Sequence, residues 1–235
     1  MNEPTPHSSK GKNKETPPGN GLKRQILIVD DHPLFRHGLA QLLNAQEDLA
    51  ACGEAEDAPA ALEAVRESKP DLVIVDISLK GTNGVELMKS IKAESPKLPV
   101  LIVSMHDESL YALRALRAGA KGYVMKKQPL DDVMAAVRKV LDGQIYVSPS
   151  LADQLIYKVV RGNDGDKGAM ENLTDREIEV LQLVGQGKGT RQIAEELRLS
   201  VKTIESHRLH IKEKLHLKTA SEMIRFAVDW VNHQA

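Results

Sequence analysis

Three carboxylates fall at the ends of apolar runs in the first half of the chain. Asp30 and Asp31 end the run "QILIV", and Asp76 ends the run "DLVIV". Carboxylates that lie close together raise one another's pKa and destabilise the fold unless a cation is present. A divalent ion removes this conflict, and Mg²⁺ suits the site because it prefers oxygen ligands and is commonly held by one or two carboxylates.

A hydroxyl and an ammonium group complete this set at two further strand ends. Ser104 ends the run "PVLIVS", and Lys126 follows "GYVM". A cation, a hydroxyl and a metal around one carboxylate form a receptor for a tetrahedral oxyanion. The pattern predicts phosphoryl transfer onto a carboxylate, with Asp76 as the nucleophile and the metal spreading the charge of the transferred group.

The apolar runs that carry these residues alternate with helical patterns. Five β-rich runs, "QILIVD", "LAACGEA", "DLVIVDI", "PVLIVSM" and "AKGYVMK", are separated by helices that begin near Pro33, Ala58, Gly84, Ser109 and Pro129. This alternation predicts a parallel sheet, because each parallel crossover needs a helix to span it. Ligands of such sheets bind beyond the carboxyl ends of the strands, so we expect the polar residues to converge there.

Residues 25–141 resemble a response-regulator receiver domain through "LIVDDHP", "DLVIVDISL", "VLIVSM" and "GAKGYVMK". The resemblance implies a flavodoxin-like, doubly wound α/β fold with five parallel strands. It also assigns roles. Asp76 is the phosphorylation site, Lys126 and Ser104 bind the phosphate, Tyr123 changes rotamer when Ser104 moves, and Mg²⁺ is held by Asp30, Asp31, Asp76 and the backbone carbonyl of Ser78.

Some residues near these motifs have a simpler interpretation. Tyr123 is alternatively plain packing, and Cys52 is expected to be an inert core residue. His32 and Pro33 are expected to start a helix rather than to take part in the chemistry. The sequence departs from the family at Lys80, where receivers often carry proline; no catalytic group is lost.

The second half of the chain changes to an all-helical pattern. Thr174 with Glu177 fits a capping box, and Ser200 stands where a further helix should begin. The predicted helices are 174–186, 190–197, 201–215 and 219–232.

Positive charge is concentrated in one part of this helical region. Residues 172–235 carry ten Lys and Arg against nine Asp and Glu, whereas residues 198–218 carry six against two. Such a surplus is the footprint of a phosphate-facing surface. In the predicted helix 201–215 the apolar stripe consists of Ile204, Ile211 and Leu215. The opposite side carries Lys202, Ser206, Leu209, His210 and Glu213, with Glu205 at its edge.

Residues 173–233 are similar to the LuxR-type helix-turn-helix domain through "LTDREIEVLQLVGQGKGTRQIAEEL" and "LSVKTIESHRLHIKEKLHLKT". A helix, a tight turn and a capped helix with outward polar groups place a recognition helix in the major groove of double-stranded DNA. By this resemblance the base-facing residues are Lys202, Glu205, Ser206 and Leu209, and the phosphate-facing residues are Thr203, His207, Arg208 and Lys212.

Two of the base-facing residues have defined chemistry. Glu205 can accept a hydrogen bond from a cytosine amino group, and Leu209 can meet a thymine methyl group. The last helix carries an apolar stripe with two open interpretations, the domain core alone or dimer contacts as well. The stripe consists of Ala220, Met223, Ile224, Ala227 and Val231.

The bulk composition is that of a globular protein, with 235 residues, 41% hydrophobic and 28% charged. A formal charge of −1 gives no global attraction to nucleic acid or membranes, so DNA must be met by a local patch. A single cysteine, no signal-peptide pattern and no apolar run near the roughly 20 residues of a spanning helix favour a cytoplasmic protein without a membrane partner.

The chain therefore divides into four predicted stretches. Residues 1–22 are rich in polar residues and proline and are expected to be a disordered tail. Residues 23–143 form the receiver domain. Residues 144–171 are a linker with one helix in "SLADQLIYKVV", and residues 172–235 are the small all-α DNA-binding domain.

Together the two resemblances point to a NarL/FixJ-type response regulator, a transcription regulator and not an enzyme. They imply that a sensor histidine kinase phosphorylates Asp76 in a magnesium-dependent reaction and that this switches DNA binding or dimerisation. The expected partners are that kinase, double-stranded DNA and a second copy of the chain when it is phosphorylated or DNA-bound. RNA polymerase is a further candidate.

Three alternatives remain open from the residues. A phosphorylation-independent regulator would keep the DNA function without the switch, and a protein-interaction adaptor would need no DNA. A magnesium-dependent phosphohydrolase also uses an aspartyl nucleophile. Such enzymes typically carry Asp-x-Asp at the first strand, whereas here the acids are adjacent and the expected nucleophile follows the third strand.

Overall fold

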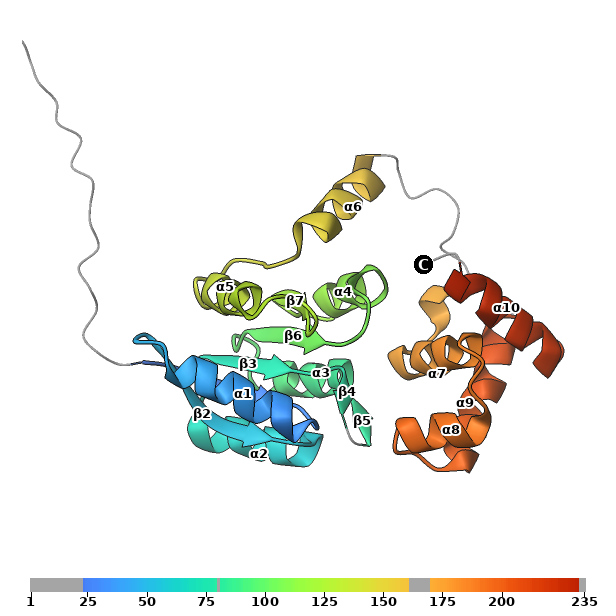
Figure 1. The fold of residues 1–235 in the computed structure, drawn as a ribbon, viewed down its shortest axis with the longest axis horizontal. Helices are drawn as coiled ribbons and strands as arrows, with labels where there is room; N and C mark the ends of the chain where they lie inside the picture. Colours follow the sequence, from blue (N-terminus) through green and yellow to red (C-terminus); the bar gives the residue numbers. More distant parts are fainter. Residues whose placement is uncertain (1–22, 80, 161–169, 233–235) are drawn as a thin grey trace, which may run out of the picture.

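The structure, a computed structural model, describes residues 23–79, 81–160 and 170–232. The predicted tail 1–22, Lys80 and residues 161–169 of the predicted linker lie outside the described residues. The described chain forms an α/β body (residues 23–146) and a helical body (residues 170–232), with one helix between them in sequence (Figure 1). None of the described helices is long and apolar enough to cross a membrane.

A five-stranded parallel sheet forms the centre of the α/β body, in the order β2-β1-β3-β6-β7. The order reverses at β1, so that β1 and β3 are neighbours and their last residues, Val29 and Val75, pair directly. The predicted doubly wound fold is confirmed. The strands are β1 (Arg24–Val29), β2 (Leu49–Ala55), β3 (Leu72–Val75), β6 (Val100–Ser104) and β7 (Gly122–Met125).

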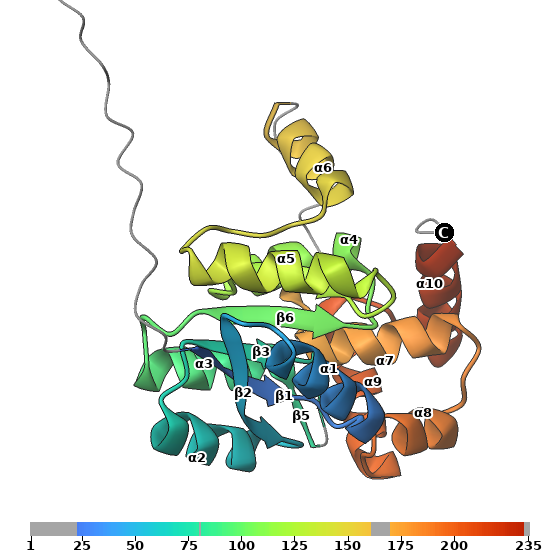
Figure 2. The same ribbon diagram turned by 60° about the vertical axis from the view of Figure 1, so that its left-hand side comes forward.

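Helices cover both faces of this sheet (Figures 1 and 2). Buried residues of α1 and α5, such as Leu43 and Val137, share one core with the sheet. Buried residues of α2, α3 and α4, such as Ile91 and Tyr111, share the other core, which continues into the helical body. The helices are α1 (Pro33–Asn44), α2 (Ala58–Ser68), α3 (Gly84–Glu94), α4 (Glu108–Arg117) and α5 (Leu130–Leu141).

The helical body is built from four helices after a single 3-10 turn. The capping box of Thr174 and Glu177 is confirmed, and the Ser200 hydroxyl accepts from the Thr203 amide at the start of α9. The elements are α6 (Pro149–Val160) before this body, then η1 (Met170–Asn172), α7 (Asp175–Gly185), α8 (Thr190–Glu196), α9 (Val201–Lys214) and α10 (Ala220–Asn232).

The structure adds one feature that the sequence did not predict and bears on one that the sequence left open. A short hairpin of β4 (Ser78–Leu79) and β5 (Thr82–Asn83) follows Asp76, and strands of two residues are too short to give an alternating pattern. The apolar stripe of α10 is only partly core. Met223 and Ala227 are fully buried, but Ala220 is exposed and Ile224 is 44% exposed.

Only a narrow strip of α10 is buried, because α10 packs closely on α7. A side-chain carbon at Gly185 in α7 would lie 2.4 Å from the Ala227 carbonyl oxygen, so the two backbones approach closely. Close approach along one line leaves residues to either side of it in solvent. Exposed side chains of α10 such as Ile224 therefore lie outside the domain core.

The turn after Asp76 generates a prediction about stability. A Cβ on Gly84 would lie 1.9 Å from the Asp76 carbonyl oxygen. We therefore expect Gly84→Ala to lower the free energy of unfolding by about 1–3 kcal/mol, because the backbone must shift to admit the methyl group. Urea denaturation measures the change. Gly38→Ala in α1 is the matched control, since nothing lies within 4 Å of that position and alanine favours a helix. A Gly84→Ala protein as stable as the control would contradict the close approach.

Candidate functional site

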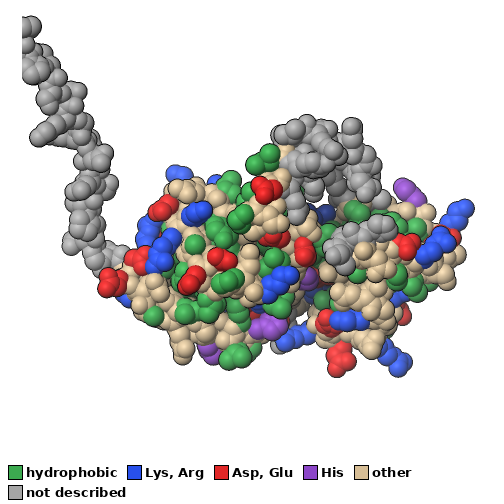
Figure 3. Space-filling view, turned by 45° about the horizontal axis from the view of Figure 1, so that its top comes forward, with side chains coloured by type: hydrophobic (Ala, Val, Ile, Leu, Met, Phe, Trp, Pro, Cys, Tyr) green, Lys and Arg blue, Asp and Glu red, His purple; other side chains and the backbone are tan. Residues whose placement is uncertain are grey.

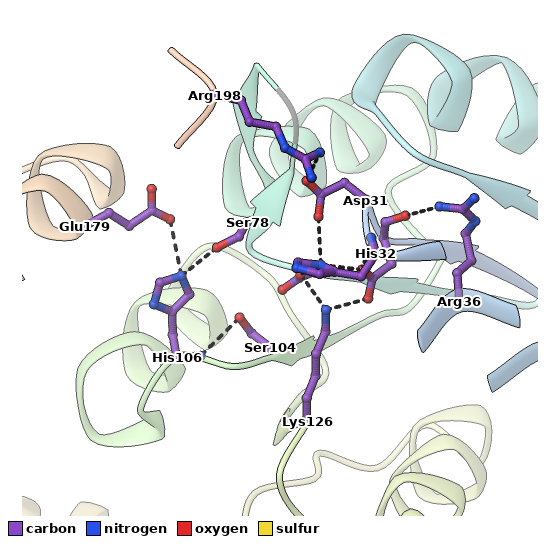
Figure 4. A network of polar contacts seen from close by, with 11 residues as sticks. Asp31, His32, Arg36, Ser78, Ser104, His106, Lys126, Glu179 and Arg198 are labelled. Carbon is purple, nitrogen blue, oxygen red and sulfur yellow. Dashed lines mark hydrogen bonds and ion pairs between the residues drawn. The ribbon is translucent and has the colours of Figure 1, made fainter. Parts of the chain in front are cut away.

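The acidic side chains lie at the carboxyl edge of the sheet, where β1 and β3 end side by side. The Lys126 ammonium nitrogen lies 2.6 Å from one carboxylate oxygen of Asp30 and 2.6 Å from one of Asp76. Ligand atoms of Asp30, Asp31, His32 and Asp76 all lie within 4.8 Å of one another. Figure 4 shows the side chains of Asp31, His32 and Lys126 pointing toward one another. The structure therefore brings together the residues that the sequence placed at separate strand ends.

Hydrogen bonds of the backbone extend the sheet just past the strands and fix these positions. The Asp76 amide donates to the Val29 carbonyl, and the Lys126 amide donates to the Ser104 carbonyl. The Lys126 ammonium group also lies 4.6 Å from the centre of the Phe35 ring, a distance suited to a cation–π contact. Contacts therefore fix both the backbone and the ammonium group of Lys126.

The charges and free oxygens of the cluster fit a divalent cation. One carboxylate oxygen of Asp76 is buried and accepts no hydrogen bond from the described residues, and the buried Oδ1 oxygen of Asp31 lies 2.9 Å from His32 Nδ1. Burial raises the pKa of Asp76, and the charge of Asp30 adds to this, whereas Lys126 and Ser104 oppose it. Buried carboxylate oxygens in a cluster with more aspartates than lysines are the kind of ligand that Mg²⁺ prefers.

His32 belongs to this cluster, which the sequence did not predict. It precedes α1 as its N-cap residue and Pro33 begins the helix, as expected. Its ring nitrogen Nδ1 also lies 2.9 Å from an Asp31 oxygen and 3.2 Å from an Asp30 oxygen. Its position directly after two aspartates is the signal that could have found it.

Ser104 and Tyr123, the predicted switch residues, are both fully buried. The Tyr123 hydroxyl donates to the His106 carbonyl at 2.9 Å, and the His106 amide donates to the Ser104 hydroxyl oxygen at 3.4 Å. The segment after β6 therefore connects the two side chains. Burial lowers the pKa of His106 to about 4, with the charges of Arg176 and Lys126 adding to the effect, so the imidazole is neutral at pH 7.

The helical body supplies a buried carboxylate beside this segment. Glu179 of α7 is 1% exposed, accepts from the Asn83 side-chain amide at 3.0 Å and lies 3.6 Å from His106 Nε2. Burial raises the pKa of Glu179 to about 7 despite the opposing charge of Arg176. The Ser78 hydroxyl lies 2.7 Å from the same His106 nitrogen, so one imidazole connects the two bodies (Figure 4).

Two arginines form ion pairs across the same interface. Arg198, in the turn between α8 and α9, donates to an Asp31 carboxylate oxygen at 2.7 Å. Arg114 of α4 donates to Asp175 at 2.7 Å and to the Leu173 carbonyl. Partners as far as 167 residues apart carry no local sequence signal, so sequence reasoning missed Arg198, Glu179 and His106.

A cavity lies between the two bodies, directly over the acidic cluster. Its volume is about 470 Å³, and a furrow between the bodies is visible in Figure 3. The α/β body lines it with Asp31, Asp76 and Ser78, and the helical body lines it with Glu179 and Arg198. The phosphoacceptor candidate thus faces a space that both bodies enclose.

The predicted DNA-facing side chains of α9 lie away from this cavity. Lys202, Glu205, Ser206 and Leu209 are exposed, and Leu209 retains 49% of its accessible surface. The predicted phosphate-facing residues are half-buried, and two of them contact neighbours within the helical body. The half-buried residues are Thr203, His207, Arg208 and Lys212; the Thr203 hydroxyl lies 2.7 Å from that of Ser200, and Arg208 donates to Thr190 at 3.4 Å.

Comparisons with known families match both bodies. Residues 26–138 match the response regulator receiver domain, and residues 171–227 match the luxR family of bacterial regulatory proteins. Among curated relatives, the oxygen regulatory protein NreC of Staphylococcus haemolyticus is 37% identical over 209 residues, covering 87% of this chain and 96% of that protein. NreC of Staphylococcus carnosus is 35% identical with the same coverage.

Solved structures of response regulators are also similar to this chain. RcsB of Salmonella enterica serovar Typhimurium, bound to promoter rprA with phosphomimetic BeF₃⁻, is 26% identical with a TM-score of 0.58, covering 88% of this chain and 99% of that one. A LuxR-family two-component response regulator from Aurantimonas sp. SI85-9A1 is 34% identical with a TM-score of 0.56, covering 59% of this chain and 99% of that one.

The shared lysine generates a prediction about metal dependence. Lys126→Met leaves the buried carboxylates of Asp30 and Asp76 without their counter-ion. We expect a loss of roughly 3–5 kcal/mol in the free energy of unfolding without metal, because uncompensated buried charges are strongly destabilising. Added Mg²⁺ should recover more stability than in the wild type, since it replaces the lost charge. Urea denaturation in EDTA and in Mg²⁺ measures both effects. Lys127→Met, at an exposed neighbour, is the control, and equal losses in the two variants would refute the prediction.

Proposed function

Because the chain belongs to the response-regulator family with a LuxR-type DNA-binding domain, we propose that Asp76 is its phosphoacceptor. The protein is a phosphorylation-controlled DNA-binding transcription regulator. One observation carries the assignment of the acceptor. Asp76 is 2% exposed and lines the cavity; one carboxylate oxygen is held by Lys126, and the other accepts no hydrogen bond from any residue that the structure describes. That free oxygen is the nucleophile.

The phosphoryl donor is the phosphohistidine of a sensor histidine kinase. A carboxylate oxygen of Asp76 attacks the phosphorus atom, the phosphorus–nitrogen bond breaks, and the donor imidazole leaves with its bonding electron pair and takes up a proton. Lys126 and Ser104 are placed to bind the oxygens of the transferred group, because both lie beside Asp76. Charge-assisted hydrogen bonds of this kind stabilise an anion where its charge increases.

The magnesium site uses the acidic cluster around the acceptor. Asp30, Asp31, Asp76 and the backbone carbonyl of Ser78 would hold the ion, because ligand atoms of the three aspartates lie within 4.8 Å of one another. When bound, Mg²⁺ spreads the negative charge of the phosphoryl oxygens. The protein's own contribution is to hold three carboxylates at the ends of β1 and β3 and the Ser78 carbonyl at the start of β4. The site then needs little rearrangement before transfer.

Phosphorylation changes the contacts at the interface between the two bodies. A phosphoryl group on Asp76 adds negative charge to the cavity that Glu179 also lines, and it draws Ser104 and Lys126 toward its oxygens. Tyr123 follows Ser104, since His106 connects the two. Repulsion of Glu179 and movement of His106 both weaken the closed arrangement.

The exposure of α9 supports repositioning of the helical body rather than uncovering of the base-facing side chains. Lys202, Glu205, Ser206 and Leu209 already face solvent when the two bodies are in contact. Release of the helical body would instead let two copies align on inverted half-sites as a homodimer. Contact of the bound dimer with RNA polymerase belongs to the same proposal.

The acceptor and the switch are tested by selecting DNA sequences with and without beryllofluoride in the presence of Mg²⁺. We expect the phosphoryl mimic to raise operator affinity about 5–150-fold in the wild type, the usual range of coupling between two sites. Asp76→Asn should abolish the response, because the mimic needs the carboxylate. Asp131→Asn, at an exposed carboxylate in the first turn of α5, is the matched control and should respond as the wild type. A full response in Asp76→Asn would exclude the assignment.

The α9 contacts are tested on the selected operator. Lys212→Ala should weaken binding on all sequences and lower the slope of log K against log salt by about 1, because one phosphate contact is lost. Glu205→Gln should instead change the preference at one base pair by about 1–3 kcal/mol. Glu213→Gln, at an exposed residue of α9 outside both predicted sets, should do neither. Fluorescence anisotropy at several salt concentrations separates the three outcomes, and identical salt slopes in all variants would contradict the proposed contacts.

A further inference from the structure

We propose that Arg198 and Mg²⁺ compete for Asp31, so that closure of the helical body and loading of the metal oppose each other. This inference rests on the proposed magnesium site and adds a regulatory role for one residue of the DNA-binding domain. It makes occupancy of the metal site, before any phosphorylation, a determinant of how the two bodies are arranged. Figure 4 shows the two side chains in contact.

The contact is short and reaches a proposed metal ligand directly. Arg198 Nη1 lies 2.7 Å from one Asp31 carboxylate oxygen, and the Asp31 side chain is 10% exposed. The other Asp31 oxygen is buried and lies 2.9 Å from the His32 ring nitrogen Nδ1, within the acidic cluster. The Asp31 side chain is therefore shared between the cluster on one side and the guanidinium group on the other.

The backbone of the helix-turn-helix holds Arg198 in this position. Arg198 has a φ of +53°, a left-handed conformation that costs energy for any residue other than glycine or asparagine. The turn is fixed on both sides, because the Arg198 amide donates to Glu195 and the Leu199 amide donates to Ala194. The position of the guanidinium group is thus tied to the position of the whole helical body.

The negative charge that remains in the acidic cluster can be balanced by Mg²⁺, or in part by Arg198, but not by both. Asp30, Asp31 and Asp76 together carry three negative charges, and Lys126 neutralises one of them, which leaves two for a divalent ion. Arg198 neutralises half of this remainder when the bodies are closed. With Mg²⁺ in place the site has no charge left for Arg198, and the two cations repel each other at close range.

Other contacts between the bodies do not have this property. Arg114 binds Asp175, and Asn83 binds Glu179, and neither contact uses a carboxylate of the acidic cluster. Within the described part of the chain, only the Arg198–Asp31 pair joins the helical body to a carboxylate that would bind Mg²⁺. Metal binding is therefore coupled to closure through Arg198 rather than through the interface as a whole.

Coupling of this kind is reciprocal. Closure lowers the affinity for Mg²⁺ by the same factor by which Mg²⁺ lowers the tendency to close. Release also frees a guanidinium group in the turn that precedes α9, where the phosphates of a DNA backbone offer an alternative anion. The same arginine then has one anionic partner in each arrangement of the protein.

The affinity for Mg²⁺ tests the competition in the full chain. Arg198→Asn removes the guanidinium group while keeping a residue that tolerates the left-handed turn. We expect it to bind Mg²⁺ about two- to fivefold more tightly than the wild type in isothermal titration with Mg²⁺ alone, the effect of losing one half-exposed ion pair. Arg191→Asn, at an exposed arginine on α8, is the matched control and should leave the affinity unchanged.

The distance between the two bodies is a second readout that does not depend on activity. Spin labels at Glu47→Cys and Ser221→Cys, both exposed, in a Cys52→Ser background report that distance by pulsed electron resonance. Mg²⁺ should move the wild-type distribution toward longer distances. Arg198→Asn should show a larger fraction of long distances without metal and a smaller response when Mg²⁺ is added.

The outcomes separate this inference from the proposed function. Equal Mg²⁺ affinity in Arg198→Asn and Arg191→Asn, with beryllofluoride still acting through Asp76, would overturn the competition and leave the phosphoacceptor standing. Absence of saturable Mg²⁺ binding in every variant, together with no response to beryllofluoride, would overturn the metal site and the competition together. Tighter binding in Arg198→Asn with an unchanged distance distribution would also overturn it, because the competition requires opening.

Discussion

The rest of the structure depends on three carboxylates at the carboxyl edge of a parallel sheet, two of which share one lysine. Asp30, Asp31 and Asp76 repel one another, and Lys126 at 2.6 Å from two of them neutralises only part of that charge. A low-dielectric setting makes both the repulsion and the attraction strong. Part of the negative charge therefore remains unbalanced by Lys126, which is the basis of the proposed magnesium and phosphoryl sites.

The helical body takes part in the same electrostatic system. It places Arg198 on one carboxylate of the cluster and the buried Glu179 beside His106, so it contributes one positive and one negative group to the cavity over the acceptor. Any reaction that changes the charge in this cavity changes the balance of these contacts. Phosphorylation and metal binding can then act on the DNA-binding body without a long pathway of intermediate residues.

The arrangement of α9 limits how such a signal can be read. Its base-facing side chains are exposed while the two bodies are in contact, so the recognition surface itself needs no refolding. In the proposed function, control acts on where that surface is held. The close packing of α10 on α7, with Gly185 against Ala227, ties these two helices together within the helical body.

The sequence by itself determined the elements and the chemistry of each half. Strand and helix periodicity and the capping box of Thr174 are local signals, and the acidic residues at strand ends converge because parallel strands end at a common edge. The tertiary structure alone decided that His32 turns into the cluster, that Ile224 is exposed, and that Arg198 meets Asp31. These outcomes depend on rotamers, on helix packing and on contacts between residues far apart in the chain, and none of the three leaves a periodic pattern in the sequence.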